Sequence, residues 1–190
     1  SKLFVDEIVH QSSQGSGTIT IGASGETVAL ASGATQSGFS TPSRYFHGYS
    51  GTSNQSFTSN AITKLTLINN VIQSNTSYDT STQKFTATAD DVGDWLFQGQ
   101  ISVYVNANNM YKFRLQVYKN GSADFGTYFY EDGGTASGGR HRTGTIRSVI
   151  TVAENDYFEL YGYAVGTSPE FVGGDGNGYR QCNFTGVKLD

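Results

Sequence analysis

Three closely spaced aspartates, Asp90, Asp91 and Asp94, form one group of side chains that could bind a metal ion. Calcium is bound by several carboxylate and carbonyl oxygens that converge on one point, and acids grouped in a turn can supply them. Acids of a solvated surface turn give the same pattern, and that interpretation is favoured. We therefore predict no metal and no cofactor, with calcium at these aspartates as the alternative.

A second group combines cations with aromatic rings. Tyr128 and Tyr130 precede a glycine-rich stretch that ends in Arg140, His141 and Arg142. Arginine and tyrosine are enriched where proteins bind partners, and exposed loops often carry such contacts. These five residues form a candidate partner-binding loop, and a solvated hairpin tip is the alternative.

No arrangement of residues indicates catalysis. His10, His47 and His141 lie in three separate regions, and no Gly-x-Ser-x-Gly elbow is present. Paired carboxylates, as a glycan-cleaving enzyme needs, cannot be placed in one cleft. Cys182 lies in the last expected strand, where a small buried thiol is favoured over a nucleophile. The sequence therefore predicts a protein that is not an enzyme, with no catalytic residue.

The composition is typical of an exposed β protein. It has 24 Gly, 2 Pro, 12 Tyr and 12 Phe, and only 15% charged residues. Glycine supplies the turns that join many short strands. The net charge of -4 offers no field for phosphates, so nucleic acid is not an expected partner. A single cysteine excludes an internal disulfide, and no apolar run of membrane-spanning length occurs, so membrane insertion is not expected.

Eight segments of the C-terminal region have strand character, because β-branched and aromatic residues alternate with polar ones between turn signals. Antiparallel strands in this number suit a jelly-roll sandwich, so the expected fold class is all-β. The segments are 62–72, 84–89, 95–105, 110–119, 123–130, 144–152, 157–165 and 181–189. We expect them to form one knob domain, residues 45–190.

Two further regions precede the knob. Residues 1–14 carry a short apolar cluster that either packs back on its own domain as a strand or anchors the chain to a larger assembly. The cluster consists of Leu3, Phe4, Val5, Ile8 and Val9.

Residues 15–44 are rich in Gly, Thr and Ile and contain two short alternating units closed by glycines. One copy buries too little apolar surface to offset the entropy of ordering it, so partner chains must complete a core. A β stalk is therefore favoured over a flexible linker. Its oligomer core would be Ile19, Ile21, Val28 and Leu30.

The stretch Tyr78–Trp95 has a distinctive order: Tyr78 and Asp79, a turn, Phe85-Thr86-Ala87, then Gly93 and Trp95. In this order the sequence resembles the globular head of complement component 1q, a relative of tumour necrosis factor. The likeness continues through three later stretches and covers about three quarters of the chain. Those stretches are 117–121, 148–160 and 184–189, and Phe46 and Tyr49 correspond to the opening aromatic segment.

The chain also departs from that family. Gln83, the turn 90–92 and Asn155 replace residues that are usually glycine or a proline-containing turn, and the collagen-like stem is absent. The resemblance implies a jelly roll that forms a homotrimer with one sheet of each subunit facing the threefold axis. Some members bind calcium, which is the further basis for that alternative.

The functional expectation combines an anchor, a stalk and a displayed knob. It is a virion structural protein, either a capsid decoration or head fibre or a tail-fibre component of a bacteriophage, which anchors by its N-terminus and presents the knob for host attachment. Assembly in a host cytoplasm supplies no disulfides, in keeping with the single cysteine. The expected partners are further copies of the chain, other virion proteins and a host-surface glycan or protein. The alternative is an extracellular, secreted carbohydrate- or cell-binding module similar to complement component 1q.

Overall fold

The computed structural model describes residues 43–66, 68–131, 140–174 and 181–189, with only the backbone course for 124–131. All of them lie in one unit, Pro42–Asp190. The structure there is almost entirely β, with one 3-10 helix, η2 (Ala89–Asp91). The strands are β1 (Tyr45–Ser50), β2 (Gln55–Ser56), β3 (Thr63–Lys64), β4 (Ile68–Ser74), β5 (Tyr78–Asp79), β6 (Lys84–Thr86), β7 (Gly93–Tyr104), β8 (Lys112–Lys119), β9 (Ser122–Glu131), β10 (His141–Val152), β11 (Tyr157–Val165), β12 (Glu170–Phe171) and β13 (Asn183–Lys188).

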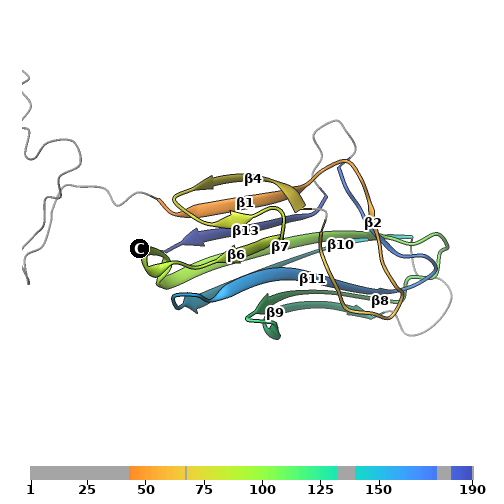
Figure 1. The fold of residues 1–190 in the computed structure, drawn as a ribbon. Helices are drawn as coiled ribbons and strands as arrows, with labels where there is room; N and C mark the ends of the chain where they lie inside the picture. Colours follow the sequence, from red (N-terminus) through yellow and green to blue (C-terminus); the bar gives the residue numbers. More distant parts are fainter. Residues whose placement is uncertain (1–42, 67, 132–139, 175–180, 190) are drawn as a thin grey trace, which may run out of the picture. The chain divides into compact units, whose positions relative to one another are not determined.

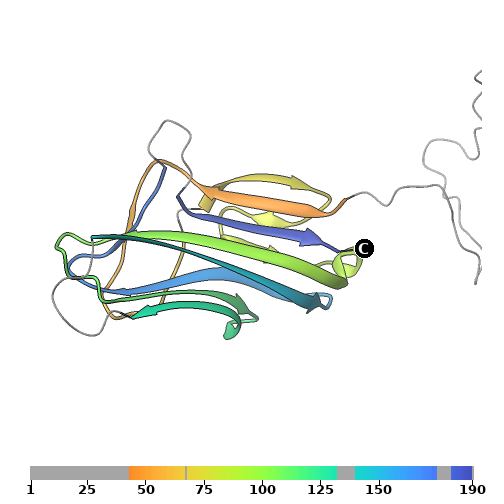
Figure 2. The same ribbon diagram turned by 180° about the vertical axis from the view of Figure 1, so that it is seen from behind.

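The strands form two antiparallel sheets stacked face to face (Figures 1 and 2). Sheet A has the order β2-β12-β7-β13-β1-β4, and β10 pairs with the other side of β7 along its whole length. Sheet B has the order β5-β6-β11-β8-β9, and β3 also pairs with β11. The chain crosses between the sheets repeatedly; for example, β7 in sheet A is followed by β8 in sheet B. This arrangement confirms the expected all-β antiparallel sandwich.

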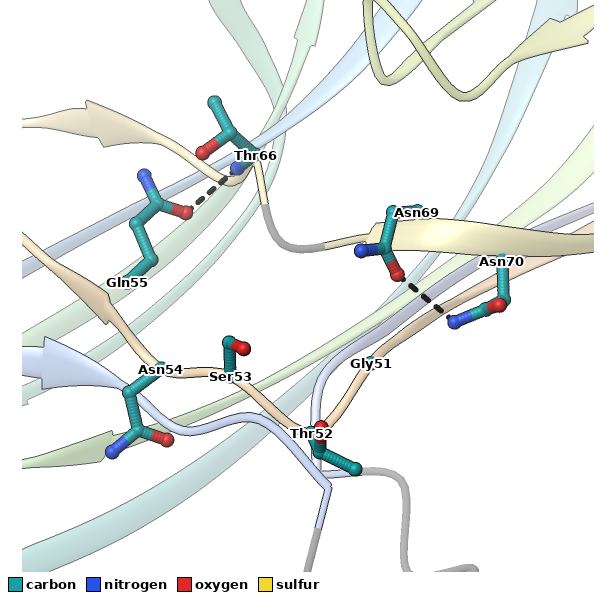
Figure 3. A pocket seen from close by; sticks show the side chains of 8 residues that line it. All are labelled: Gly51, Thr52, Ser53, Asn54, Gln55, Thr66, Asn69 and Asn70. Carbon is teal, nitrogen blue, oxygen red and sulfur yellow. Dashed lines mark hydrogen bonds between the residues drawn. The ribbon is translucent and has the colours of Figure 1, made fainter. Parts of the chain in front are cut away.

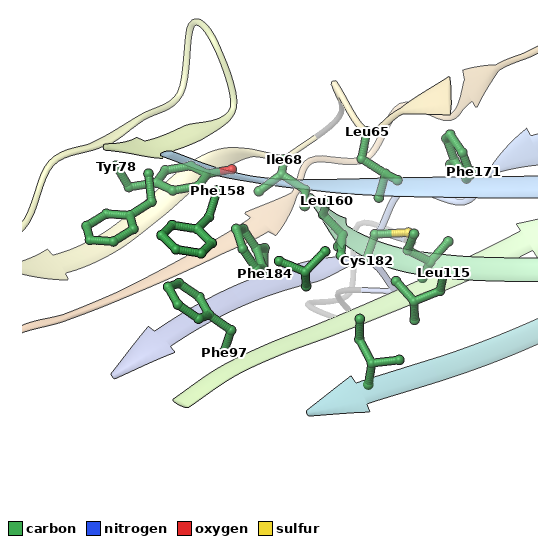
Figure 4. Packing of buried hydrophobic residues seen from close by; sticks show 14 of the residues in the cluster. Leu65, Ile68, Tyr78, Phe97, Leu115, Phe158, Leu160, Phe171, Cys182 and Phe184 are labelled. Carbon is green, nitrogen blue, oxygen red and sulfur yellow. The ribbon is translucent and has the colours of Figure 1, made fainter. Parts of the chain in front are cut away.

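Aromatic side chains fill the space between the sheets, because alternate residues of each strand point inward. Along β7 the inward positions include Trp95 and Phe97, and both are fully buried. Phe97 stacks on Phe158 of sheet B with ring centroids 4.4 Å apart, and on Phe184 of β13 at 5.9 Å. Figure 4 shows these rings converging from both sheets. Such offset contacts add to the hydrophobic gain from burial and join the two sheets.

Close packing in the core depends on glycine at one position of β13. A Cβ added to Gly186 would lie 2.4 Å from Cε1 of Phe46, a side chain that is fully buried. Phe46 in turn stacks on Tyr78 and on Phe85, each with a centroid separation of 5.0 Å. The missing side chain at Gly186 therefore makes room for the ring that joins β1 to sheet B.

One expected strand was wrong. The segment 62–72 was expected to be continuous, but it contains β3, which pairs with β11 in sheet B, and β4, which pairs with β1 in sheet A. Between them Leu65 and Ile68 are both buried. The chain crosses from one sheet to the other here, so both residues reach the core although they are not an even number of residues apart.

A second difference is β1, which the strand pattern did not include. Its inward positions are Phe46, Gly48 and Ser50. Two of these are small, so the apolar alternation that signals a strand is weak. Gly48 is small for a reason of packing, because a Cβ there would lie 2.7 Å from Cγ2 of Ile68.

Candidate functional site

Sheet A turns one face to the core and the other away from it. Cross-strand pairing places the outward side chains of neighbouring strands in rows. One row joins Tyr45 of β1 to Val187 of β13, Val187 to Leu96 of β7, and Leu96 to Val149 of β10. We call these four residues the apolar row. It runs across four strands of the sheet.

Several of these side chains are strongly exposed in the single chain. The exposed fraction is 60% for Val149 and 38% for Val187, and Ile72 on β4 is 50% exposed. Val92 and Leu189 are also exposed, at the end of the sheet where β7 begins and β13 ends. Among the large exposed apolar side chains of the described residues, Ile62 alone lies away from sheet A and its end. A concentration of this kind marks a surface that associates with another molecule.

The neighbouring row on the same face is polar and largely pairs within itself. Nδ1 of His47 and Oγ1 of Thr185 are 2.7 Å apart. Arg147 donates from Nε to Oε1 of Gln98 at 2.9 Å. The rings of His47 and Tyr49 are stacked, with centroids 5.6 Å apart. Because these polar groups already have partners, a second protein surface can cover them at a smaller desolvation cost.

The three aspartates considered as alternative calcium ligands lie at η2 and the start of β7, and they have separate roles. The carboxylate of Asp91 is fully buried and accepts a hydrogen bond from Nε of Arg44 at 2.7 Å and two from Thr88. Asp90 is largely exposed, and Asp94 accepts a hydrogen bond from Thr151 at 2.6 Å. No group of three or more metal-binding side chains gathers in the described part of the chain. Calcium binding at these aspartates stays the untested alternative to the predicted absence of a metal.

Burial raises the pKa of Asp91, but the hydrogen bonds from Arg44 and Thr88 and the charge of Arg44 outweigh it, so the pKa lies below the ordinary 3.8. The backbone carbonyl of Asp91 also accepts a hydrogen bond from Nε1 of Trp95 at 2.7 Å. Asp91 therefore acts in the fold, as a buried anion that fixes the turn leading into β7.

The predicted partner-binding loop is only partly described. Tyr128 and Tyr130 belong to β9, where their strand partners are Leu115 and Phe113 of β8. His141 and Arg142 begin β10 and pair with Tyr104 and Val103.

Arg140, just before β10, donates from Nη2 to the carbonyl oxygen of Asn106 at 3.1 Å. The stretch 132–139 lies outside the described residues. Partner binding by these residues stays a prediction. The anchor cluster within residues 1–14 and the four-residue stalk core within residues 15–44 lie outside the described residues and also stay predictions.

Cys182 is a buried structural residue in this fold. Its side chain is fully buried, and its sulfur donates to the carbonyl oxygen of Val172 at 3.2 Å. Burial raises the pKa of the thiol to about 12. The thiolate that a nucleophile requires is therefore strongly disfavoured near neutral pH.

The two stacked sheets and their strand order define a jelly roll of the tumour necrosis factor type. Among solved structures, one that is similar is Eiger TNF from S. frugiperda, with a TM-score of 0.55 and 10% sequence identity over 79% of this chain and 94% of that chain. No family model matches this chain, and no curated protein matches it. The comparison confirms the expected fold.

The outward residues of the apolar row were not singled out from the sequence. They lie inside expected strands, but β10 carries Val149 and Ile150 side by side, and only the register shows that Ile150 is buried while Val149 points outward.

Within the described residues, no helix is long and apolar enough to cross a membrane.

Proposed function

We propose that this protein is a homotrimeric, non-catalytic binding module whose subunits associate through the outer face of sheet A. The observation that carries the proposal is the apolar row, which a single chain leaves in water. Closed rings of identical subunits are a common solution for a protein with one such surface. The tumour necrosis factor-like fold supports a trimer over other symmetric assemblies, as the resemblance implied.

The energetic argument favours covering this face. Burying a Val or Leu side chain fully contributes about 1.5–3 kcal/mol relative to leaving it exposed. Val149, Val187 and Ile72 are each more than one third exposed. Each subunit of a trimer would bury such side chains together with the polar row, whose hydrogen bonds are already made.

The solution mass of the full chain tests the proposal. One chain has a mass of 20.4 kDa, and we expect light scattering to give three times that value. Val149→Glu places a charge in the apolar row and should shift the mass toward that of one chain. Ile62→Glu is the matched control, because Ile62 is also exposed but lies away from sheet A, and it should leave the trimer intact. A wild-type monomer, or a Val149→Glu trimer, would contradict the proposal.

A finer proposal concerns where the trimer works. We propose that it is a virion structural protein of a bacteriophage, a capsid decoration, head fibre or tail-fibre component, held at the virion surface by residues 1–14. The support is the sequence order of an apolar cluster, a Gly/Thr/Ile-rich segment and a β domain. Mass spectrometry of purified particles from the source of the sequence should detect the chain. Its absence from particles would contradict this role.

The second candidate is a secreted carbohydrate- or cell-binding module. The observation that favours it is a polar pocket at one end of sheet A, lined by hydroxyl and amide groups. Recovery of the chain as a free extracellular protein would support this candidate over the virion role.

A further inference from the structure

A pocket of about 550 Å³ lies between two segments that are distant in the sequence (Figure 3). One is the connection from β1 to β2 with the start of β2. The other follows β3 and enters β4, the edge strand that pairs with β1 in sheet A. The volume is within the range of small-molecule sites. The lining residues are Gly51, Thr52, Ser53, Asn54, Gln55, Thr66, Asn69 and Asn70.

The lining chemistry narrows the class of ligand. It contains hydroxyls, primary amides and a glycine, and it has no charged and no aromatic side chain. A phosphate or carboxylate would find no cationic partner here, whereas tight anion sites use charge-assisted hydrogen bonds. An apolar ligand would bury amides without partners, which is costly. A neutral ligand rich in hydroxyl groups satisfies both constraints, because each hydroxyl can donate and accept.

Hydrogen bonds hold the pocket wall in place before any ligand arrives. Gln55 is fixed at both ends of its amide, since Nε2 donates to the carbonyl oxygen of Lys64 at 2.8 Å and Oε1 accepts from the backbone N–H of Thr66 at 2.7 Å. Asn54 is fixed in the same way by Glu170 and by the backbone N–H of Gly173. A wall that is already ordered loses less entropy on binding.

Other polar atoms of the lining keep hydrogen-bonding capacity. Nδ2 of Asn70 donates to Oδ1 of Asn69 at 2.9 Å, which fixes the two amides side by side (Figure 3). The Asn69 amide N–H groups and the Asn70 carbonyl form no hydrogen bond with the described residues. The same holds for the hydroxyl of Thr66. An adjacent donor and acceptor match two neighbouring hydroxyls of one sugar ring.

We propose that this pocket binds a neutral carbohydrate, with Asn69, Asn70 and Thr66 as the hydrogen-bonding contacts. The inference rests on the proposed function in one respect, since it names the ligand class of the binding module. It does not rest on the trimer, because residues of a single chain make up the whole lining.

Saturation-transfer NMR on the full chain tests the proposal with stated probes. The probes are the methyl glycosides of glucose, galactose, mannose, rhamnose and N-acetylglucosamine, with glucose 6-phosphate as the charged comparison. We expect transfer to at least one neutral glycoside and weaker transfer to glucose 6-phosphate than to methyl glucoside. No transfer to any neutral glycoside, or stronger transfer to the phosphate, would overturn the proposal.

Three variants locate the binding. Asn69→Asp removes the amide donors but keeps the acceptor used by Asn70, and Thr66→Val removes one hydroxyl at nearly constant shape. Each substitution should lower the affinity for the glycoside at least tenfold. Thr58→Val is the matched control, an exposed threonine of the β2–β3 connection outside the pocket, and should bind like the wild type. If the Asn69→Asp and Thr66→Val variants bound the glycoside as tightly as the wild type, the assignment would be overturned.

Solution mass separates this inference from the proposed function. A monomer that binds the glycoside would contradict the trimer and leave the pocket assignment standing. A trimer that does not bind the glycoside would contradict the pocket assignment and leave the trimer standing.

Discussion

At the scale of single residues, the buried anion Asp91 shows how this sequence orders the turn that leads into β7. Its carboxylate has no exposed surface and receives hydrogen bonds from Arg44 and Thr88. Its backbone carbonyl holds the indole of Trp95, the first large core side chain of β7. A charge that is removed from water needs such partners, so Arg44 and Asp91 act together.

Replacing the cation of this pair should be strongly destabilising. Arg44→Met leaves Asp91 buried without its counter-ion, and we expect a loss of about 3 kcal/mol in the free energy of unfolding. Lys188→Met is the matched control: Nζ of Lys188 approaches the same turn and donates to the carbonyl oxygen of Asp90, not to a buried carboxylate. It should cost about 1 kcal/mol or less. Urea unfolding at pH 7 and one protein concentration measures both, and equal losses would contradict this role of Asp91.

Acid should destabilise the fold through its paired carboxylates. For both Asp91 and Asp156, burial raises the pKa, but hydrogen bonds and a nearby cation outweigh it, so each folded-state pKa lies below 3.8. Their stabilising contribution is therefore complete above the unfolded pKa and is lost as pH falls below about 4 through the lowered values. Urea unfolding between pH 7 and pH 2 should show this decline.

The control for the acid prediction is Asp156→Asn. Oδ2 of Asp156 lies 2.7 Å from Nζ of Lys119, and Oδ1 of Asp156 accepts a hydrogen bond from Nδ2 of Asn120. Without a carboxylate at this position, the decline between pH 4 and pH 2 should be shallower. An unchanged slope would show that other groups cause the acid sensitivity.

At the scale of strands, β13 connects the core to the outer face of sheet A. Phe184 and Gly186 point inward, whereas Thr185 and Val187 point outward. The strand therefore packs against the aromatic core on one side and supplies both rows of the candidate interface on the other. Its position between β1 and β7 places it within the sheet rather than at an edge.

Gly186→Ala should disrupt this packing. The added methyl group would lie 2.4 Å from Cε1 of Phe46, which is fully buried and contacts the rings of Tyr78, Phe85 and Phe184. We expect a loss of about 2–3 kcal/mol in unfolding free energy, as is typical of overpacked cores. Thermal unfolding would report it. A variant as stable as the wild type would show that the core is looser than described.

Elements with one apolar face were predictable from the sequence, and those with small or mixed faces were not. Trp95, Phe97, Ile101 and Val103 all fall on one side of the two-residue alternation, so β7 was expected nearly as it is. The small inward residues Gly48 and Ser50 weaken the apolar alternation of β1, so this strand was not expected from the sequence. The candidate site was harder to foresee, because the apolar row depends on the register of four strands. The pocket brings together segments whose residues, such as Gln55 and Asn69, carry no local pattern.

At the scale of the whole molecule, the fold leaves a large part of its exposed apolar surface on one sheet. A monomer with this surface would be prone to non-specific association, and a closed assembly removes that exposure. We therefore propose that the outer face of sheet A is the contact between subunits. The polar pocket lies across the sheet from β10 and is assigned to a ligand.

Thiol labelling of a Val149→Cys chain tests this central claim most directly. The native Cys182 is buried and its pKa is raised to about 12, so a thiol reagent at neutral pH reports on position 149 alone. Glu154→Cys, in the exposed turn between β10 and β11, sets the rate for a free surface. If sheet A is the subunit contact, Cys at 149 reacts at least tenfold more slowly than Cys at 154 in the native protein. Equal rates would contradict it, because Val149 is 60% exposed in a single chain.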